Sequence, residues 1–294
     1  MSQPQSAAVK LAAGPLTLVL APACGGGIAE FSCDGVHMLR PATEEAWAAG
    51  SPRAMGSFAM VPFSGRVAEA TFPWEGKPVD LIPNFPPERH AIHGDGWQQP
   101  WSVVTASASV AQIAFDHVGS TPGWPWSYRC EQTFTLDPDC LTMTIAIENR
   151  GDTPMPVGFG FHPYFMRTPN VRLRAAVPEV WVWDTAKRPA AKIATPAPWA
   201  LDPERPVAGL ALDHCFAGWD GSAEITWPEH RLAVTIEAGA KLRHLIVFTP
   251  ETDVFCVEPA THAPDALNLE PDSLPLLAPG KSISGGCRLR VRRL

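Results

Sequence analysis

The sequence has no block of basic residues, no close pair of cysteines and no long hydrophobic run, and each absence excludes a class of protein. The net charge is −7, and a nucleic-acid surface would need clustered Lys and Arg to displace counterions. The seven cysteines are odd in number and form no Cys-x-x-Cys pair, which argues against a disulfide framework or a cysteine zinc site. No run reaches the roughly 18 apolar residues of a membrane span. We therefore expect no nucleic-acid or membrane partner and a reducing, cytoplasmic location.

Two segments resemble a signal peptide and a basic arm, and we interpret both as strands. The stretch from Lys10 through "LAAGPLTLVLAPA" resembles a signal peptide, but Gly14 and Pro15 interrupt it and "LTLVLAP" is typical of a strand. Near the other end, the arginines of "RLRVRR" alternate with Leu289 and Val291. This alternation predicts the polar face of a last strand instead of a basic arm.

Proline is about twice as frequent as in an average protein, with 32 residues, and this indicates many turns and strand ends. In "CLTMTIAIENRG" apolar and polar residues alternate from Leu141 to Ile147, which predicts a strand paired with "YRCEQTFTL" across the "DPDC" turn. A second hairpin is predicted in "SAEITWPEHRLAVTIEAG", with its turn at Pro228 to His230. Further strands are predicted in "LTLVLAP", "GGIAEFSC", "KPVDLIP", "SVVTASAS", "VAQIAFDH", "EVWVWD", "LIVFTP", "VFCVEP" and "GCRLRVRRL".

One helix is predicted, around "TEEAWAAG", where Thr43 can cap the first turn and Glu44 and Glu45 lie near its positive end. No linker, charge run or repeat divides the chain. We therefore expect one all-β domain over residues 1–294, built as a large antiparallel β-sandwich.

Four segments hold titratable side chains in unusual surroundings: "MVPFSGRV" with Arg66, "RHAIHGDGW" with His90, His93 and Asp95, "GFGFHPYF" with His162, and "VFCVEPATHAPDALN" with Glu258 and Asp265. The aromatic neighbours of His162 predict burial and a lowered pKa, in a core histidine or in a catalytic one. Glu258 ends an apolar strand, so its carboxylate either pairs with an arginine or serves chemistry. None of these signals is specific alone.

Together, in this order, the segments "PFSGRV", "HAIHGDGW", "GFGFHPYF" and "CVEPATHAPDALN" resemble the aldose 1-epimerase (galactose mutarotase) family. The resemblance implies a β-supersandwich fold and an isomerase that interconverts the α and β anomers of free aldoses without metal or organic cofactor. It also implies that Glu258 is the general base, His162 the general acid, His93 a second pocket histidine and Arg66 a substrate-binding arginine.

The match is weaker at other positions. The family's usual Asn before the arginine is Gly65 here, which implies the loss of one sugar contact. Asp213 matches the family's sugar-binding aspartate, with Asp220 as the competing choice. Trp97 is expected to form a wall of the site, and His90 to support His93 by a hydrogen bond. Three further tryptophans could also stack on a sugar: Trp101, Trp124 and Trp126. Core packing is nevertheless expected for at least half of the four tryptophans, Trp97 included.

Three alternatives remain open at this stage. His90, His93 and His162 could bind zinc, but the first two lie in a loop and anomer exchange needs no Lewis acid. A non-catalytic carbohydrate-binding or regulatory module could keep the same cleft, and the presence of both Glu258 and His162 argues against it. A glycoside hydrolase or lyase usually needs paired carboxylates, and only Glu258 is well placed by the sequence.

The sequence does not identify the sugar. A phosphate or sulfonate on the substrate would require additional cations at the site, and the candidates are Arg89, Arg167 and Lys187. We expect a small-molecule sugar as the only ligand, and a monomer or homodimer.

Overall fold

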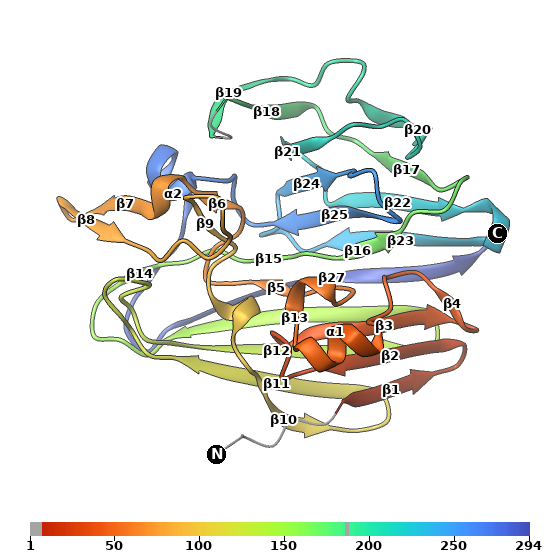
Figure 1. Cartoon of the computed structure of the whole chain (residues 1–294), viewed down its shortest axis with the longest axis horizontal. Helices are drawn as coiled ribbons and strands as arrows, with labels where there is room; N and C mark the ends of the chain where they lie inside the picture. Colours follow the sequence, from red (N-terminus) through yellow and green to blue (C-terminus); the bar gives the residue numbers. More distant parts are fainter. Residues whose placement is uncertain (1–7, 186–187) are drawn as a thin grey trace.

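The structure is a computed structural model that describes residues 8–185 and 188–294. Two large antiparallel sheets dominate it, as the sequence predicts (Figure 1). The strands of the nine-stranded sheet are, in spatial order, β10 (Ser102–Ala106), β11 (Val110–His117), β12 (Tyr128–Asp137), β13 (Cys140–Asn149), β27 (Ser282–Arg293), β23 (Leu232–Ala238), β22 (Ser222–Trp227), β17 (Arg172–Ala175) and β20 (Leu201–Pro206).

The eight-stranded sheet carries the candidate site. Its order is β19 (Pro189–Ala194), β18 (Glu179–Trp183), β21 (Asp213–Ala217), β24 (His244–Phe248), β25 (Val254–Ala260), β15 (Gly160–Phe161) and β5 (Ala59–Met60), and β16 (Tyr164–Met166) also pairs with β25. A four-stranded sheet contains β1 (Val9–Ala13), β2 (Leu16–Ala21), β3 (Gly27–Cys33) and β4 (Val36–His37).

Short elements complete the fold. The two-stranded ribbons are β6 (Arg66–Val67) with β9 (Ala91–Ile92), β7 (Thr71–Trp74) with β8 (Lys77–Asp80), and β14 (Met155–Pro156) with β26 (Leu276–Leu277). The helices are α1 (Glu44–Ala49), α2 (Ala266–Leu269) and the 3-10 turns η1 (Pro52–Ala54), η2 (Ala68–Ala70), η3 (Gly96–Gln98), η4 (Pro228–His230) and η5 (Pro271–Ser273).

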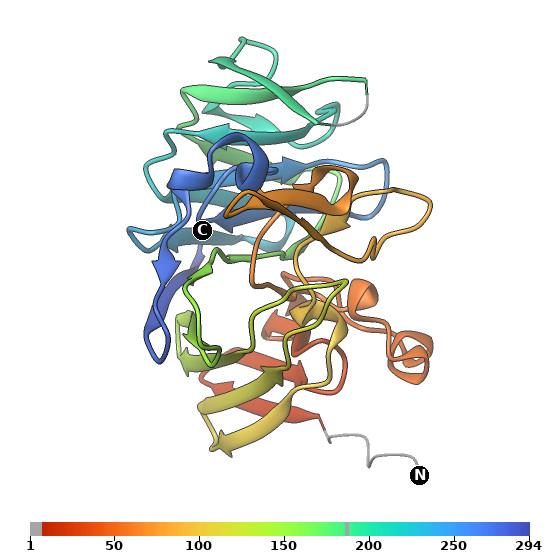
Figure 2. The ribbon, with the colours of Figure 1, turned by 90° about the vertical axis from the view of Figure 1, so that its left-hand side faces the viewer.

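The nine-stranded sheet is the common layer of the sandwich. The four-stranded sheet packs on β11 and β12 at one end, and the eight-stranded sheet lies over the other part, as Figures 1 and 2 show. Phe165 of β16 meets Trp227 of β22 across the layers, and one continuous apolar core connects the three sheets. Strands β6 and β7 lie beside α2 although more than 180 residues separate them in the chain, and both views agree.

The local predictions are confirmed where alternation or capping supported them. Strands β12 and β13 pair from Tyr128↔Asn149 to Asp137↔Cys140, and η4 is the predicted turn between β22 and β23. Thr43 accepts a hydrogen bond from the Ala46 N–H at 3.2 Å and caps α1. The second helix, α2, was not predicted because one turn of four residues is too short to show a helical period.

In β27 the arginine side chains alternate with buried apolar side chains, as predicted. All seven cysteines are free and buried. Within residues 8–185 and 188–294, no helix is long and apolar enough to cross a membrane.

Candidate active site

A cavity of about 650 Å³ opens on one face of the eight-stranded sheet. Strands β18, β21, β24 and β25 form its floor, and the segments around β6, β9 and η3 form a wall. All six predicted site residues line it, namely Arg66, His93, Trp97, His162, Asp213 and Glu258. The fold therefore brings to one place the side chains that the sequence spreads over almost 200 residues.

Strand pairing explains why the floor residues share a face. Ile246 lies directly opposite Glu258, and Phe248 lies opposite both Cys256 and Asp213. Directly opposed residues point to the same side of a sheet, as do residues two apart along one strand. Asp213, Ile246, Phe248 and Glu258 therefore line the cavity from three adjacent strands.

Glu258 and His162 form the central contact of the cavity. His162 Nε2 lies 3.3 Å from Glu258 Oε1, with the two side chains 10% and 3% exposed. The imidazole is held by aromatic packing, because Phe58 and Tyr164 each lie 4.6 Å from it between ring centroids. Among the described residues, the His162 Nδ1 has no hydrogen-bond partner.

Burial moves the pKa values of this pair in opposite directions. It is the main cause that lowers the pKa of His162 to about 3, and the nearby positive charges of Arg40 and Arg53 contribute to this value in the same direction. Burial raises the pKa of Glu258 well above its usual range, with a contribution from Asp213 that Arg66 opposes. Both shifts disfavour the charged form of the group, which is the expected effect of desolvation.

His93 faces the pair with a defined tautomer. Its ring lies 5.2 Å from that of His162 between centroids, and its Nδ1 accepts a hydrogen bond from the Gly65 N–H at 3.1 Å. Burial, His162 and Arg66 hold the pKa of His93 well below its usual value. The neutral ring must then carry its proton on Nε2, so His93 presents a hydrogen-bond donor to the site.

Gly65 is required by this arrangement. It has a φ of +69°, and a Cβ there would lie 2.9 Å from the Pro264 Cβ. The His93 N–H also donates to the Gly65 carbonyl at 2.9 Å, so the two residues exchange hydrogen bonds. Where the family pattern has an Asn side chain, this chain therefore uses the backbone to orient a histidine.

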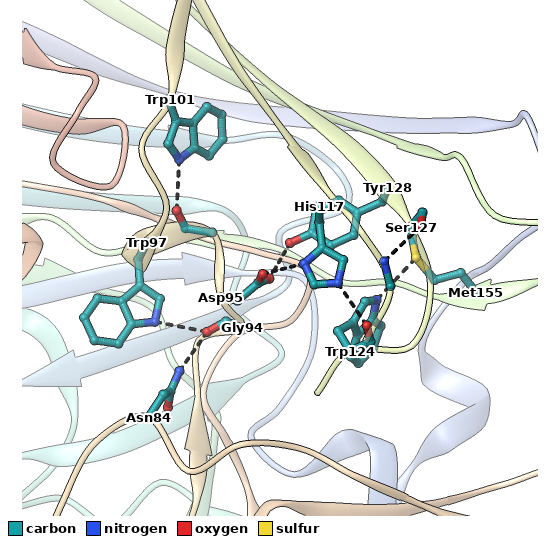
Figure 3. A network of polar contacts seen from close by, with 12 residues as sticks. Asn84, Gly94, Asp95, Trp97, Trp101, His117, Trp124, Ser127, Tyr128 and Met155 are labelled. Carbon is teal, nitrogen blue, oxygen red and sulfur yellow. Dashed lines mark hydrogen bonds and ion pairs between the residues drawn. The ribbon is translucent and has the colours of Figure 1, made fainter. Parts of the chain in front are cut away.

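The loop that carries His93 is fixed by backbone carbonyls and by buried polar side chains (Figure 3). Asn84 Nδ2 and Trp97 Nε1 both donate to the carbonyls of Ile92 and Gly94. Gly94 has a φ of +67°, and a Cβ there would lie 1.9 Å from the Val61 carbonyl oxygen. The glycine at position 94 therefore permits the close approach of this loop to Val61.

Asp95, the residue between Gly94 and Gly96, belongs to a separate polar network. Its carboxylate accepts a hydrogen bond from Tyr128 Oη at 2.6 Å and contacts His117 Nδ1 at 2.6 Å. His117 Nε2 lies 2.9 Å from the Trp124 carbonyl, which can only accept. Burial opposes charge on His117, but Asp95 and this carbonyl outweigh it and raise the pKa of His117. The sequence left Asp95 without a role, and the network anchors it to β11 and β12 (Figure 3).

Arg66 and Asp213 complete the polar lining. Arg66 Nε lies 3.0 Å from Glu88 Oε2, so this arginine is held at the cavity by an ion pair. Asp213 lines the cavity, whereas its competitor Asp220 is exposed and accepts a hydrogen bond from the Ser222 N–H at 2.9 Å. The choice that the sequence left open is therefore resolved by position, in favour of Asp213.

Other candidates lie elsewhere. Trp97 lines the cavity, whereas the other three tryptophans are buried away from it: Trp101, Trp124 and Trp126. His90 is buried, and its Nδ1 accepts a hydrogen bond from the Glu69 N–H at 3.1 Å.

Of the three candidate cations for an anionic substrate, the two that the structure describes, Arg89 and Arg167, do not line the cavity. Arg89 is exposed, and Arg167 donates hydrogen bonds to the carbonyls of Pro250 and Val207. Lys187 lies outside the described residues. The cations found at the cavity, besides Arg66, are Arg40 and Arg53, which sequence reasoning missed. Sequence reasoning also missed Tyr164 as a residue of the cavity. The position of Tyr164, two residues after His162, was a usable signal, since alternate residues of a strand share a face.

The potential metal ligands that the structure groups differ from the predicted zinc set. Among the described residues, the ligand atoms that lie within 4.8 Å of one another belong to His162, Cys256 and Glu258. Burial raises the pKa of the Cys256 thiol well above its usual value, so this sulfur is a poor ligand unless a metal displaces its proton. The three-histidine site is not the arrangement seen.

The protein is an all-β sandwich with an open cavity, and a buried carboxylate contacts an imidazole on the cavity floor. These features are typical of the class of proteins that transfer protons to and from a small polar ligand. The comparisons give its family: the family model for aldose 1-epimerase matches residues 8–290, and this chain belongs to that family.

The relatives agree with this assignment. The uncharacterized protein YphB of Escherichia coli K12 is 32% identical over 281 residues, with 92% of this chain and 94% of that protein covered. A crystal structure of a candidate aldose 1-epimerase from the same organism matches with a TM-score of 0.90 at 30% identity, covering 98% of this chain and 99% of that one. A galactose mutarotase-like protein from Clostridium acetobutylicum has the same fold, with a TM-score of 0.88 at 19% identity and coverage of 97% and 95%.

Proposed function

We propose that this protein is a mutarotase, which interconverts the α and β anomers of an aldose by opening and closing the sugar ring. The observation that carries the proposal is the contact of 3.3 Å between Glu258 Oε1 and His162 Nε2 on the floor of the cavity. Ring opening needs one group to accept a proton and another to donate one at adjacent atoms. A carboxylate and an imidazole in contact can serve the C1 hydroxyl and the ring oxygen of one sugar.

The proton transfers balance in each direction. Glu258 accepts the proton of the C1 hydroxyl while the His162 imidazolium donates a proton to the ring oxygen. The bond between C1 and the ring oxygen breaks, its electron pair stays on that oxygen, and C1 becomes an aldehyde carbon. Rotation about C1–C2 presents the other face, and the reverse transfers close the ring. Both side chains end in the protonation state in which they began.

The opposed pKa shifts fit a pair that shares one proton. In the empty cavity, burial places this proton on Glu258, because the neutral forms of both groups are favoured. A sugar hydroxyl that donates a hydrogen bond to Glu258 stabilises the carboxylate and moves the proton to His162 across the 3.3 Å contact. Substrate binding thus creates the state that starts the reaction.

The remaining side chains hold the sugar. His93 offers its Nε2–H, Arg66 offers guanidinium donors beside Glu88, and Asp213 accepts from hydroxyls at the far side of Glu258. Trp97 gives an apolar wall and packs against Phe58 at 5.5 Å between ring centroids. These groups supply alignment, on which the proton transfers depend.

Exchange NMR on a panel of aldoses tests the proposal. We expect cross-peaks between the α and β C1 protons at equilibrium, at rates above the spontaneous reaction measured without protein. Exchange no faster than the spontaneous rate for every sugar, together with saturable sugar binding, would show a binding module. Because Asp213 and Glu88 add further carboxylates to the cavity, an aryl glycoside should be tested in parallel, and release of the aryl group would indicate a hydrolase.

A further inference from the structure

Two arginines lie together at one end of the cavity, beside the proposed acid His162. The Arg40 Cζ is 4.1 Å from the centroid of the Tyr164 ring, and that ring contacts His162. Arg40 Nη2 donates a hydrogen bond to the Arg53 carbonyl, which ties the two residues together. Both arginines line the same cavity as His162, and their positive charges lower the pKa of that histidine.

Their positions are built by packing. Arg40 Nη2 also donates to the Met55 carbonyl at 2.7 Å, which fixes its guanidinium over Tyr164. The Arg53 Cζ lies 4.1 Å over the centroid of the Phe85 ring. Stacking on aromatic faces orients a guanidinium without using its hydrogen-bond donors. Arg40 Nη2 is used by two carbonyls and Arg40 Nε is buried, so among the described residues the donors left for a ligand are Arg40 Nη1 and the guanidinium of Arg53.

Neither arginine has an acidic partner within residues 8–185 and 188–294, although ion pairs are common elsewhere in the molecule. Arg66, the third arginine of the cavity, pairs with Glu88, and Arg172 pairs with Glu204. By contrast, the hydrogen bonds of Arg40 go to backbone carbonyls alone. Two uncompensated cations at the mouth of a cavity produce a local field that attracts an anion.

Sugar chemistry indicates which part of a substrate would meet them. In the proposed reaction His162 donates to the ring oxygen, and the two carbons bonded to that oxygen are C1 and C5. Since C1 must face Glu258, C5 and its C6 substituent extend on the other side of His162. Arg40 lies over Tyr164, whose ring contacts His162, and Arg53 lies over Phe85 in the same cavity.

The geometry points to a subsite for an oxyanion at C6, in which Arg40 and Arg53 bind the phosphate or sulfonate of an anionic hexose. This inference rests on the proposed mutarotase function and adds the substrate class to it. Arginine suits the task because its planar donors match the oxygens of tetrahedral anions. Arg53, which is exposed, would meet the anion first, and Arg40 would hold it from inside the cavity.

The test compares kcat/KM by exchange NMR for glucose, glucose 6-phosphate and glucose bearing a 6-sulfonate. We expect at least one anionic sugar to exceed glucose by about 10–100-fold, the contribution of one or two charge-assisted hydrogen bonds. Added salt should reduce this preference, because the arginine at the mouth is screened. The larger of the two anionic ratios identifies phosphate or sulfonate as the natural group.

Variants connect the preference to the arginines. In Arg53→Gln, the ratio of kcat/KM for the anionic sugar to that for glucose should fall about tenfold, and Arg40→Met should lower it too. Arg288→Gln is the matched control, since Arg288 is an exposed arginine on β27 of the nine-stranded sheet and does not line the cavity. Its ratio should not change.

The outcomes separate the two proposals. If all three sugars exchange with equal kcat/KM, the oxyanion subsite is wrong and the mutarotase function stands. If none exchanges, the mutarotase function fails, and calorimetric titration still tests the subsite. Tighter binding of glucose 6-phosphate than of glucose, lost in Arg53→Gln, would then support it, and equal affinities would overturn it.

Discussion

The molecule buries a histidine against a carboxylate in two places, His162 with Glu258 and His117 with Asp95, and the two pairs differ in their hydrogen bonding. The His117 to Asp95 contact is 2.6 Å, and the His117 ring uses both nitrogens. The His162 to Glu258 contact is 3.3 Å, and the other ring nitrogen of His162 has no partner among the described residues. The His117–Asp95 pair, called the first pair below, thus has a partner for each ring nitrogen, whereas the His162–Glu258 pair, the second pair, lines the cavity with one ring nitrogen unpartnered among the described residues.

The pKa shifts of the two histidines follow from this difference in hydrogen bonding. Hydrogen bonds to acceptors on both sides raise the pKa of His117, despite the burial that opposes its charge. Burial without such partners lowers the pKa of His162 to about 3. An imidazole and a carboxylate thus form an ion pair that anchors a loop in one place and, in the proposed mechanism, a pair that passes a proton to a substrate in the other. Partners, more than residue identity, decide which role a buried pair has.

The largest effect is expected from breaking the second pair. Glu258→Gln keeps the shape of the side chain but cannot accept a proton, so turnover should fall by about 10²–10⁴-fold while sugar binding survives. His162→Asn should behave similarly, and the double variant should cost little more than either single one, because both residues act in one exchange. Exchange NMR and calorimetric titration with the same sugar measure both quantities.

Exposed residues of the same types serve as controls for these variants. Glu75→Gln and His230→Asn should leave turnover unchanged, because both side chains are exposed and neither these residues nor their chain neighbours line the cavity. Near wild-type exchange by a folded Glu258→Gln protein would contradict its assignment as the base. Full additivity of the two losses would mean that Glu258 and His162 act in separate steps.

Breaking the first pair should affect stability first and activity second. Asp95→Asn removes the charge that compensates His117, and we expect a loss of about 2–3 kcal/mol in the free energy of unfolding. Because Asp95 lies two residues after His93, kcat/KM should also fall, by about tenfold. Urea unfolding and exchange NMR measure the two effects.

Asp116→Asn is the matched control for this variant. Asp116 precedes His117 in β11, its side chain is 63% exposed, and it pairs with Arg129 at the surface. Its removal should change the free energy of unfolding by less than about 0.5 kcal/mol. Equal losses in Asp95→Asn and Asp116→Asn would show that the first pair is no anchor.

The sequence predicted one of these pairs and missed the other for a physical reason. Glu258 and His162 belong to short motifs that resemble a family, and the strands around them alternate in a way that a local pattern reveals. The contact of Asp95 with His117 and Tyr128 joins a loop to two strands. Only tertiary structure forms that contact, and no local pattern in the "GDG" segment indicates it.

Arg40 and Arg53 were missed for the same reason. They flank the helix α1 and reach the cavity because β3 and β4 carry the chain to Tyr164. Asp213 and Asp220 could not be separated by sequence either, since both lie near the ends of β21. The pairing of Asp213 with Phe248 decides which one faces the cavity.

A smaller effect should appear in the pH dependence of stability. The folded pKa of His117 is raised, so its contribution to stability is fully present below its unfolded pKa of about 6.5. It is lost as pH rises through the raised pKa. The difference in unfolding free energy between wild type and His117→Gln should therefore be largest near pH 5 and shrink at alkaline pH. A difference that grows with pH would contradict a charged His117.

The pH dependence of activity should reflect the His162–Glu258 pair. The state with one shared proton is bounded below by the lowered pKa of His162, about 3, and above by the raised pKa of Glu258. Below the window Glu258 cannot accept a proton, and above it His162 has none to donate. After subtraction of the spontaneous reaction, we expect a broad bell-shaped profile of kcat, limited in acid by unfolding. A sharp optimum near the usual pKa of histidine would indicate that His162 is well solvated.

The smallest effect is expected from metal removal, and it tests whether the second pair is a proton-transfer pair or part of a metal site. His162, Cys256 and Glu258 could offer three ligand atoms to one ion, yet the proposed proton transfers are complete without a Lewis acid. Exhaustive chelation should leave the exchange rate unchanged, and Cys256→Ala should lower it by less than about tenfold, since the thiol takes no part in the transfers. Loss of exchange on chelation, with recovery on adding zinc to wild type but not to Cys256→Ala, would assign these three residues as ligands. The contrast between the two buried pairs would then be one between an ion pair and a metal site.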